Sequence, residues 1–267
     1  MRFDAHQHFW NVERLDYPIL KGSELYRTIE PPTLKPELER AGFEGTVVVQ
    51  AANDEKETAY LLELAERTPW IAGVVGWVDL ADPTAAEAQL AKFADRSKLK
   101  GVRHLIMLED DPDWLVRPNV LEGLRVLASF DLAFDVAAEF PNHLRHVPTI
   151  ATRVKELRIV VDHLAKPPAD AAGAARWRAE LDAAADCPNV YGKVSGLRWA
   201  EDASYAIGAA FERFGSGRLM FGSDWPVSAL TLDYASVVRA AENAVADRPA
   251  SDVDALFRRT AAAFYRL

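Results

Sequence analysis

The sequence predicts an α/β protein, a (β/α)8 TIM barrel formed by one domain over residues 1–267. Three observations predict this fold. Apolar strand-like runs alternate with helix-like runs, eight strand-like runs can be counted, and a length of 267 residues is usual for an eightfold barrel. No internal repeat or linker-like stretch indicates a second domain.

Strands are expected where short runs of β-branched and other apolar residues are bounded by turn-forming residues. The eight expected strands cover Arg2–His8, Gly45–Ala51, Ala72–Val78, Lys100–Ile106, Leu132–Ala137, Leu157–Leu164, Val190–Gly196 and Arg218–Ser223. Helical periodicity predicts helices at Glu55–Arg67, Thr84–Phe93, Val120–Ser129, Ala174–Ala185, Ala203–Phe214, Leu232–Ala246 and Ser251–Tyr265. Asp82 before Pro83 is typical of a helix start.

The composition narrows the classes of function. Hydrophobic residues make up 49% of the chain, and 31 basic against 40 acidic residues give a net charge of −9. An acidic chain without a basic run does not suit nucleic acid or an anionic membrane. The lone Cys187 cannot form an internal disulfide, and no apolar signal or membrane-spanning segment is apparent. We therefore expect a soluble, cytoplasmic protein.

Reactive side chains gather at the ends of the expected strands, where barrel enzymes carry their active sites. Four of the six histidines stand at such ends, while His143 and His146 are expected at the surface. The strand-end residues are His6 and His8 on the first strand, Arg103 and His104 on the fourth, Asp162 and His163 on the sixth, Lys193 and Ser195 on the seventh, and Asp224 after the eighth.

His6 and His8 stand two positions apart on the first strand, and Asp224 follows the last strand. Side chains alternate faces along a strand, so both imidazoles are expected on one face. The first and last strands of a closed barrel are neighbours, which brings the carboxylate to the same mouth. Neutral imidazoles with a carboxylate suit one divalent metal, most simply zinc. A pair of hydrogen-bonded structural histidines is the alternative interpretation.

Asp224 is the expected general base, because a carboxylate beside a metal-bound water can accept its proton and later return it to a leaving oxygen. Its alternative role is to cap a helix, since Pro226 follows closely. His163 ends an apolar strand. We expect it to be a third metal ligand, or a proton or hydrogen-bond donor to a substrate carbonyl.

Cations near the strand ends are candidates for binding substrate oxygens or a carboxylate. Arg103 is the strongest, at a strand end, and Lys193 is expected to contact substrate with it. His104 is a further substrate-binding candidate, although a regular strand would turn only one of two adjacent residues inward. Lys166 and Arg198 are weaker candidates, and each cation is otherwise explained as a solvated or ion-paired charge.

Four tryptophans lie on expected mouth loops, Trp10, Trp114, Trp199 and Trp225, and aromatic rings there can stack on a flat or sugar-like ligand. Trp10 and Trp225 are the two expected to contact the ligand. Packing in the core or under a lid is the alternative. The segment Phe9–Pro32 is long and rich in aromatic residues and prolines, so it is expected to form a functional lid. No Gly-x-Ser-x-Gly elbow, phosphate-binding loop or cysteine zinc site is present.

Five ordered sequence blocks together resemble the amidohydrolase superfamily, in its branch of sugar lactonases such as L-fuconolactonases and L-rhamnonolactonases. The blocks are Asp4-Ala5-His6-Gln7-His8-Phe9-Trp10, Gly101-Val102-Arg103-His104, Asp162-His163-Leu164-Ala165-Lys166-Pro167, Lys193-Val194-Ser195-Gly196-Leu197 and Gly222-Ser223-Asp224-Trp225-Pro226. The resemblance implies a (β/α)8 barrel and hydrolysis of a small lactone. It places the family's paired histidines at His6 and His8, its strand-six histidine at His163 and its strand-eight aspartate at Asp224.

Two departures from the family pattern bear on the metal. Binuclear members carry a bridging lysine on strand four, where this chain has Arg103, and a histidine on strand five, which this chain lacks. The resemblance therefore implies one divalent metal, zinc first, or none. Some relatives use a single zinc, whereas pyrone-dicarboxylate hydrolases work without metal.

The leading hypothesis is hydrolysis of a sugar-acid 1,4-lactone, similar to L-fucono-1,4-lactone, to its aldonic acid. Asp224 would activate water, while a histidine-bound metal, or histidines with Arg103, would polarise the carbonyl. The only expected partner is the small-molecule lactone, and the oligomeric state is left open. The alternatives are metal-independent hydrolysis of a pyrone dicarboxylate or muconolactone, zinc-dependent decarboxylation, and a barrel that only binds sugar acids.

Overall fold

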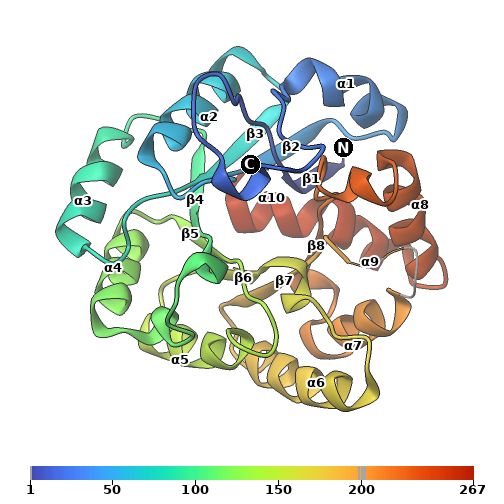
Figure 1. Cartoon of the computed structure of the whole chain (residues 1–267). Coiled ribbons are helices and arrows are strands. Elements are labelled where there is room, and N and C mark those ends of the chain that lie inside the picture. The colour runs from blue at the N-terminus through green and yellow to red at the C-terminus, as the bar shows by residue number, and fades with distance from the viewer. Residues whose placement is uncertain (1, 198, 200–202) are drawn as a thin grey trace.

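The computed structural model describes residues 2–197, 199 and 203–267. Eight parallel strands form one sheet in chain order, and helices surround it, which confirms the predicted (β/α)8 barrel (Figure 1). The strands are β1 (Phe3–Gln7), β2 (Gly45–Val49), β3 (Ile71–Gly76), β4 (Leu99–His104), β5 (Ala133–Val136), β6 (Ile159–Val161), β7 (Val190–Val194) and β8 (Leu219–Phe221).

The helices follow the strands and pack outside the barrel. They are α1 (Pro31–Arg40), α2 (Glu55–Arg67), α3 (Pro83–Lys92), α4 (Pro118–Ser129), α5 (Val147–Arg153), α6 (Ala171–Ala185), α7 (Ser204–Phe214), α8 (Tyr234–Ala244), α9 (Ala250–Asp254) and α10 (Thr260–Tyr265), with a π-helical segment at Ala255–Arg259. Aspartates cap several of them. Asp82 accepts the backbone N–H groups of Thr84 and Ala85 and starts α3, as predicted.

The sheet closes between its first and last strands. The backbone N–H of Asp224 donates to the carbonyl oxygen of His6 at 2.8 Å, and the N–H of His8 donates to the carbonyl oxygen of Trp225 at 2.8 Å. Four of the residues expected in the site, His6, His8, Asp224 and Trp225, are therefore linked in pairs by the backbone that closes the barrel.

Asp4 reinforces this closure from outside the barrel. Its carboxylate accepts the N–H of Ser223 at 2.9 Å and the hydroxyl of Tyr234 at 3.2 Å. Burial raises the pKa of Asp4 to about 6, and these hydrogen bonds oppose the rise.

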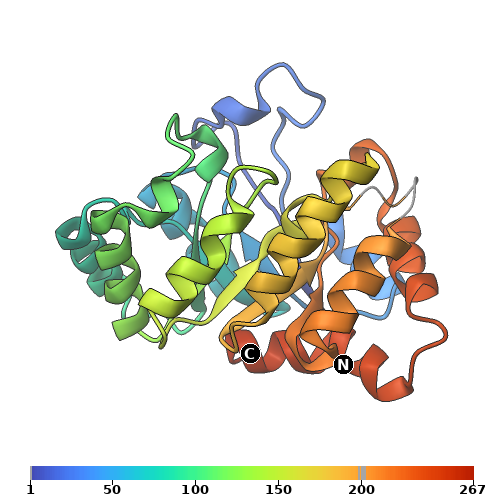
Figure 2. The same cartoon turned by 90° about the horizontal axis from the view of Figure 1, so that it is seen from below.

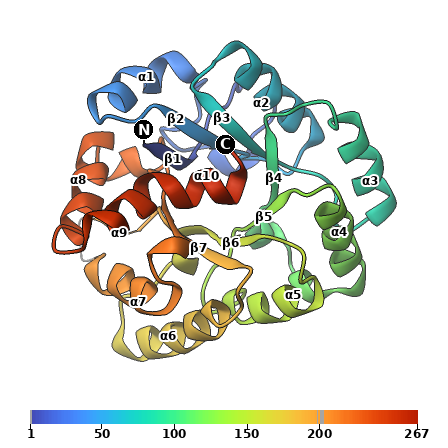
Figure 3. The same ribbon diagram turned by 180° about the vertical axis from the view of Figure 1, so that it is seen from behind.

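The barrel interior is apolar at the end opposite the site. Strand residues Val47, Val49, Val75, Ala133, Val160 and Met220 pack there against Ala261, Phe264 and Tyr265 of α10. Figure 2 shows α9 and α10 at one end of the barrel, with the loop that follows β1 projecting at the other end. Figure 3 shows the same C-terminal helices lying across the barrel opening. They close this end, so the ligand site belongs to the other.

The predicted strands agree with the structure to within two residues, except that β6 ends three residues early at Val161. The reason is the backbone after Asp162, which turns left-handed from His163. Two short helices, α1 and α5, were not predicted, and both begin at or beside prolines. The prediction of a surface His143 was wrong, because only 5% of the residue is exposed and its Nδ1 accepts the N–H of Glu139.

The segment 9–32 forms the loop expected above the barrel mouth. It is tied by an antiparallel bridge between Trp10 and Ile29 and contains a 3-10 turn at Pro18–Leu20. Among the described residues, no helix is both long enough and apolar enough to cross a membrane.

Candidate active site

A bulge in β1 turns His6 into the barrel. Between Asp4 and Gln7 the pairing advances three residues along β1, but only two along β2, from Thr46 to Val48. The extra residue lets Ala5 and His6 both face the interior, because a bulge interrupts the alternation of side chains. Gly222 makes this approach possible, since a Cβ there would lie 2.4 Å from the Cβ of His6.

Three imidazoles converge on one carboxylate oxygen at the barrel mouth. The Nε2 atoms of His8, His6 and His163 lie 3.3, 3.6 and 4.0 Å from Oδ1 of Asp224. No more than 11% of any of these four side chains is exposed. The structure therefore brings together all four residues that the sequence proposed as metal ligands.

Two of these rings are held from behind. The Nδ1 of His8 lies 2.7 Å from the carbonyl oxygen of Val49, which only accepts, so Nδ1 carries a proton, and Nε2 lies 3.3 Å from Asp224. The Nδ1 of His163 lies 2.9 Å from the hydroxyl of Ser195. Both arrangements orient Nε2 toward the centre of the site.

The chain after β6 adopts an uncommon backbone conformation. His163, Leu164, Ala165 and Lys166 all have positive φ, between 48° and 59°. Each non-glycine residue in this region costs roughly 1–2 kcal/mol, so surrounding contacts must hold the turn. Gly196 leaves room for it, because a Cβ at that position would lie 2.4 Å from Nδ1 of His163.

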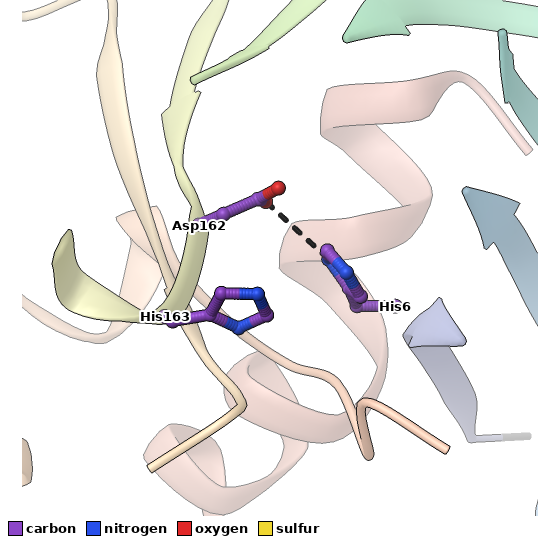
Figure 4. Close-up of side chains that lie close together, drawn as sticks. All are labelled: His6, Asp162 and His163. Atoms are coloured by element: carbon purple, nitrogen blue, oxygen red, sulfur yellow. Dashed lines mark ion pairs between the residues drawn. The ribbon is translucent and has the colours of Figure 1, made fainter. Parts of the chain in front are cut away.

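Asp162 links His6 to Arg103 within the barrel. Its Oδ1 lies 3.3 Å from Nδ1 of His6 (Figure 4). Its Oδ2 accepts from Nη1 of Arg103 at 3.2 Å. The same Nη1 lies 3.3 Å from Nε2 of His6, and Nε of Arg103 donates to Gln50 at 3.1 Å. Arg103 therefore faces the site, as expected, and is held in place by Gln50 and Asp162.

Lys193 lies at the base of the site rather than in its mouth. Its ammonium group contacts Asp135 at 2.5 Å, Asp162 at 3.0 Å and Nδ1 of His6 at 3.1 Å, and it is not exposed. Tyr265 of α10 donates its hydroxyl to the same oxygen of Asp135 at 2.7 Å. A series of buried polar contacts thus connects Tyr265 in the C-terminal helix to His6, through Asp135 and Lys193.

Burial and the neighbouring charges set the protonation states. Burial acts to raise the pKa of Asp224, but the imidazoles of His163, His8 and His6 outweigh it and hold that pKa below its ordinary value. Burial also acts to raise the pKa of Asp162. Lys193, His6 and Arg103 outweigh it and hold that pKa well below its ordinary value. Burial lowers the pKa of His6 and of His163. At neutral pH the site therefore presents the carboxylates of Asp162 and Asp224 and the neutral imidazoles of His6 and His163.

The donor set fits a divalent metal. In tetrahedral zinc with bonds of about 2.0–2.1 Å, two ligand atoms are roughly 3.3 Å apart, which is close to the separations of 3.3 and 3.6 Å seen here. Donor atoms lie within 4.8 Å of one another in two overlapping groups that share His6, one with His8 and Asp224, the other with Asp162 and His163. Metal binding through Nε2 of His6 would replace its contact with Arg103.

His104 lies outside this cluster. Its Nδ1 accepts the indole N–H of Trp77 at 3.0 Å, so Nε2 carries the proton and lies 2.7 Å from Glu109. Its ring stacks on Trp114 with 4.0 Å between centroids, and Asn53 completes its surroundings. Adjacent residues of β4 therefore face opposite sides, as expected. Arg103 faces the barrel interior, and His104 packs among Trp77, Glu109 and Trp114.

The two tryptophans expected to stack on ligand are largely buried. Trp10 is fully buried and donates its indole N–H to the carbonyl oxygen of Arg27 at 2.8 Å, with its ring 6.3 Å from that of His8. The structure places it behind His8, which differs from the expected place at the mouth. Trp225 is 8% exposed and packs edge-on against Phe9.

The remaining expected cations contribute little to the cluster. Lys166 pairs with Glu139 and half of its side chain is exposed. Arg198 lies outside the described residues.

Sequence reasoning did not assign a role to three buried residues that shape the site: Gln50, Asp135 and Glu57. The first two carried a signal, because each is a polar residue in an apolar strand run near the barrel mouth. Glu57 carried none. It lies on α2 and accepts the N–H groups of Ala51 and Ala52, and burial raises its pKa to about 8.

A partly apolar pocket of about 460 Å³ adjoins the loop over the mouth. Its lining residues are Asp16, Pro18, Ile19, Ala51, Ala52, Asn53, Asp54, Leu105 and Leu108. Ile19 and Leu108 expose half or more of their surface there. Asn53 of this pocket accepts a hydrogen bond from Gln50, and Gln50 accepts one from Arg103. The pocket is therefore linked to the active-site arginine through Gln50.

The chain is similar to amidohydrolases over almost its whole length. The family model described as amidohydrolase matches residues 3–267. An L-fucono-1,5-lactonase from Burkholderia ambifaria is 40% identical over 239 residues, which covers 86% of this chain and 81% of that protein. An L-fucono-1,5-lactonase from Burkholderia multivorans is 36% identical, with coverage of 100% and 96%.

A solved structure shows the same architecture. The crystal structure of an amidohydrolase from Burkholderia multivorans with bound zinc superimposes with a TM-score of 0.89 at 33% identity, covering 100% of this chain and 99% of that one.

Proposed function

The chain belongs to the amidohydrolase family, and we propose that it hydrolyses the lactone of a sugar acid to the open-chain acid. One observation carries the proposal, the convergence of three imidazole Nε2 atoms on Oδ1 of Asp224 at a barrel mouth. The relatives named as L-fucono-1,5-lactonases support the substrate class.

Asp224 is the proposed proton carrier. Its lowered pKa keeps it ionised, so it can accept a proton from the attacking water and then donate it to the leaving ring oxygen. A carboxylate this acidic is a weak base toward ordinary water. A divalent metal held by His6, His8, His163 and Asp224 would supply the missing chemistry by acidifying water and polarising the lactone carbonyl.

Arg103 is the proposed oxyanion partner. Its guanidinium lies 3.3 Å from His6 and is oriented by Gln50 and Asp162. A fixed cation at this position opposes the negative charge that develops on the carbonyl oxygen during water attack. The proposed role of Lys193 is to hold His6 and Asp162, because all of its contacts lie below the mouth.

The size of the lactone ring is part of the proposal. The sequence favoured a 1,4-lactone, whereas the relatives carry names of 1,5-lactonases. Both rings present the same reacting ester. We therefore propose an aldonolactone substrate similar to L-fuconolactone, and the two ring forms are separated by experiment.

The test is a pH-indicator assay in which each turnover releases one carboxylic acid. Chelated enzyme is given L-fucono-1,4-lactone or freshly prepared 1,5-lactone, with and without zinc, and the rate without enzyme is subtracted. Asp224→Asn serves as the matched inactive control. Faster hydrolysis of either lactone by the wild type alone supports the proposal, and dependence on zinc identifies the metal. No turnover of any sugar lactone would overturn it.

The pyrone-dicarboxylate alternative finds less support in the charges. A dicarboxylate needs two cationic anchors, and among the described residues in the cluster only Arg103 faces the mouth, since Lys193 is enclosed by Asp135 and Asp162. Decarboxylation is tested in the same series by measuring carbon dioxide release from an unsaturated carboxylic acid.

A further inference from the structure

A second pocket lies at the end of the barrel opposite the active site. It is formed where the chain passes from α3 to β4, from α4 to β5 and beyond the end of α10, and its volume is about 250 Å³. Figure 2 shows this end of the barrel, with α10, facing away from the loop over the active site. The lining residues are Leu90, Phe93, Ala94, Arg96, Ser97, Leu99, Lys100, Phe130, Asp131, Leu132, Arg158, Tyr265 and Arg266.

The charge of this lining is opposite to that of the whole chain. Four cations and one carboxylate, that of Asp131, line the pocket, although the protein has a net charge of −9. One of the four, Arg96, pairs with Glu66 at 2.5 Å, which leaves three cations around Asp131. Asp131 is shared by Arg158, at 3.4 Å, and Arg266. Lys100 donates to the carbonyl oxygen of Arg266 at 2.9 Å. A carbonyl group carries only a partial charge, so it orients the ammonium group without neutralising it.

The positive charges act on one another. Burial first, and then Lys98, Arg158 and Arg266, lower the pKa of Lys100. Like charges gathered around a partly enclosed space attract a counter-ion, because part of the solvent that would screen them is excluded. Arg158 donates from Nη1 to the carbonyl oxygen of Phe264 and from Nη2 to that of Asp131, so its guanidinium is fixed at the pocket. Guanidinium groups suit phosphate and carboxylate oxygens.

The rest of the lining is apolar. Phe93, Leu99, Phe130 and Leu132 also line the pocket. A site that combines cationic donors with an apolar floor suits an organic anion better than a bare inorganic one.

We propose that this pocket binds a small organic phosphate or carboxylate, with its anionic group on Lys100, Arg158 and Arg266 and its apolar part against Phe93 and Phe130. This site is separate from the catalytic cluster and does not depend on the proposed reaction. The two anion types share the recognition chemistry, and the experiment distinguishes them.

The test is calorimetric titration of the full chain with phenyl phosphate and, separately, with benzoate. Phenol is the neutral control of similar shape, and inorganic phosphate measures the anionic part alone. We expect saturable binding of at least one aromatic anion that weakens with added salt, weaker binding of inorganic phosphate, and none of phenol. Absence of saturable binding by both aromatic anions would overturn the proposal.

Variants assign the binding to this pocket. Lys100→Met and Arg266→Gln should each weaken binding by about tenfold or more. Lys92→Met, an exposed lysine of α3 that pairs with Glu55, is the matched control and should leave the affinity unchanged. If Lys100→Met does not fold, Arg266→Gln decides, because 59% of its side chain is exposed. Binding that survives both pocket variants, or is lost in Asp224→Asn, would overturn the assignment.

Discussion

The ammonium nitrogen of Lys193 lies 3.0 Å from Oδ1 of Asp162, and neither side chain is exposed. Asp135 contacts the same ammonium group, so one buried cation serves two buried carboxylates. Desolvation raises the pKa of Asp135 to about 6, against the attraction of Lys193. The position of His6 depends on this group, because Lys193 and Asp162 both contact its Nδ1.

Lys193→Met should destabilise the protein strongly. It leaves Asp135 and Asp162 buried without their shared cation, and breaking a buried ion pair from one side costs about 3–5 kcal/mol. Urea unfolding measures the loss. The double variant Lys193→Met with Asp135→Asn should recover part of it, because one uncompensated charge is removed. Lys35→Met, which breaks an exposed pair with Glu39, is the control and should change stability by less than about 0.5 kcal/mol.

Asp224→Asn should abolish most lactone hydrolysis while preserving the fold. An amide keeps the shape of the carboxylate but cannot accept and return the proton, a function that contributes typically 10²–10⁴-fold in rate. The measurement is kcat/KM on the lactone, with circular dichroism to verify folding. Asp233→Asn, at the cap of α8 after the same strand, is the control. Near-wild-type activity of Asp224→Asn would rule out this mechanism.

The sequence predicted the barrel because its signals are local. Strands alternate with helices along the chain, and a reactive residue follows each of several strands. His6, His8, His163 and Asp224 were predicted to meet for the same reason, since parallel strand ends share one face. The left-handed turn from His163 to Lys166 leaves no mark in a strand pattern, because its cost is met by contacts distant in sequence.

The functions of the charged residues were harder to predict. Lys193 stands at a strand end like a ligand-binding residue, but its partners Asp135 and Asp162 come from two other strands. Pairing across a barrel depends on register, which periodicity does not supply. His143 shows the same limit, because its burial follows from the way its loop folds back toward Glu139.

Gly196→Ala should lower both stability and activity. The added Cβ would meet Nδ1 of His163 at 2.4 Å, and Gly196 has a φ of +53°, which alanine adopts unfavourably. We expect a loss of about 1–2 kcal/mol from the backbone alone, and slower hydrolysis because the ring of His163 must move. Gly208→Ala in α7 is the matched control. Its Cβ meets nothing within 4 Å, so it should be neutral or stabilising by up to about 1 kcal/mol. Thermal unfolding and kcat distinguish the two.

Glu57 should make stability fall as the pH rises. Burial raises its pKa in the folded protein from 4.5 to about 8, so between these values the folded state retains a proton that the unfolded state has lost. The free energy of unfolding then decreases with pH across this window, by at most about 1.4 kcal/mol per pH unit. Glu57→Gln should flatten that slope, because an amide does not titrate. Glu63→Gln, an exposed neighbour on α2, should leave the slope unchanged. The measurement is urea unfolding from about pH 5 to about pH 8.

Ser195→Ala should weaken zinc binding without removing a metal ligand. The Ser195 hydroxyl lies 2.9 Å from Nδ1 of His163 and orients that ring, and loss of such a partner typically lowers metal affinity about 10–100-fold. The measurement is competition for zinc with a chromophoric chelator, which reads affinity independently of activity. Ser228→Ala is the matched control, since Ser228 is also buried near the mouth and its hydroxyl has no partner among the described residues. Equal zinc affinities in the two variants would mean that the fixed orientation of His163 serves the substrate carbonyl instead of a metal.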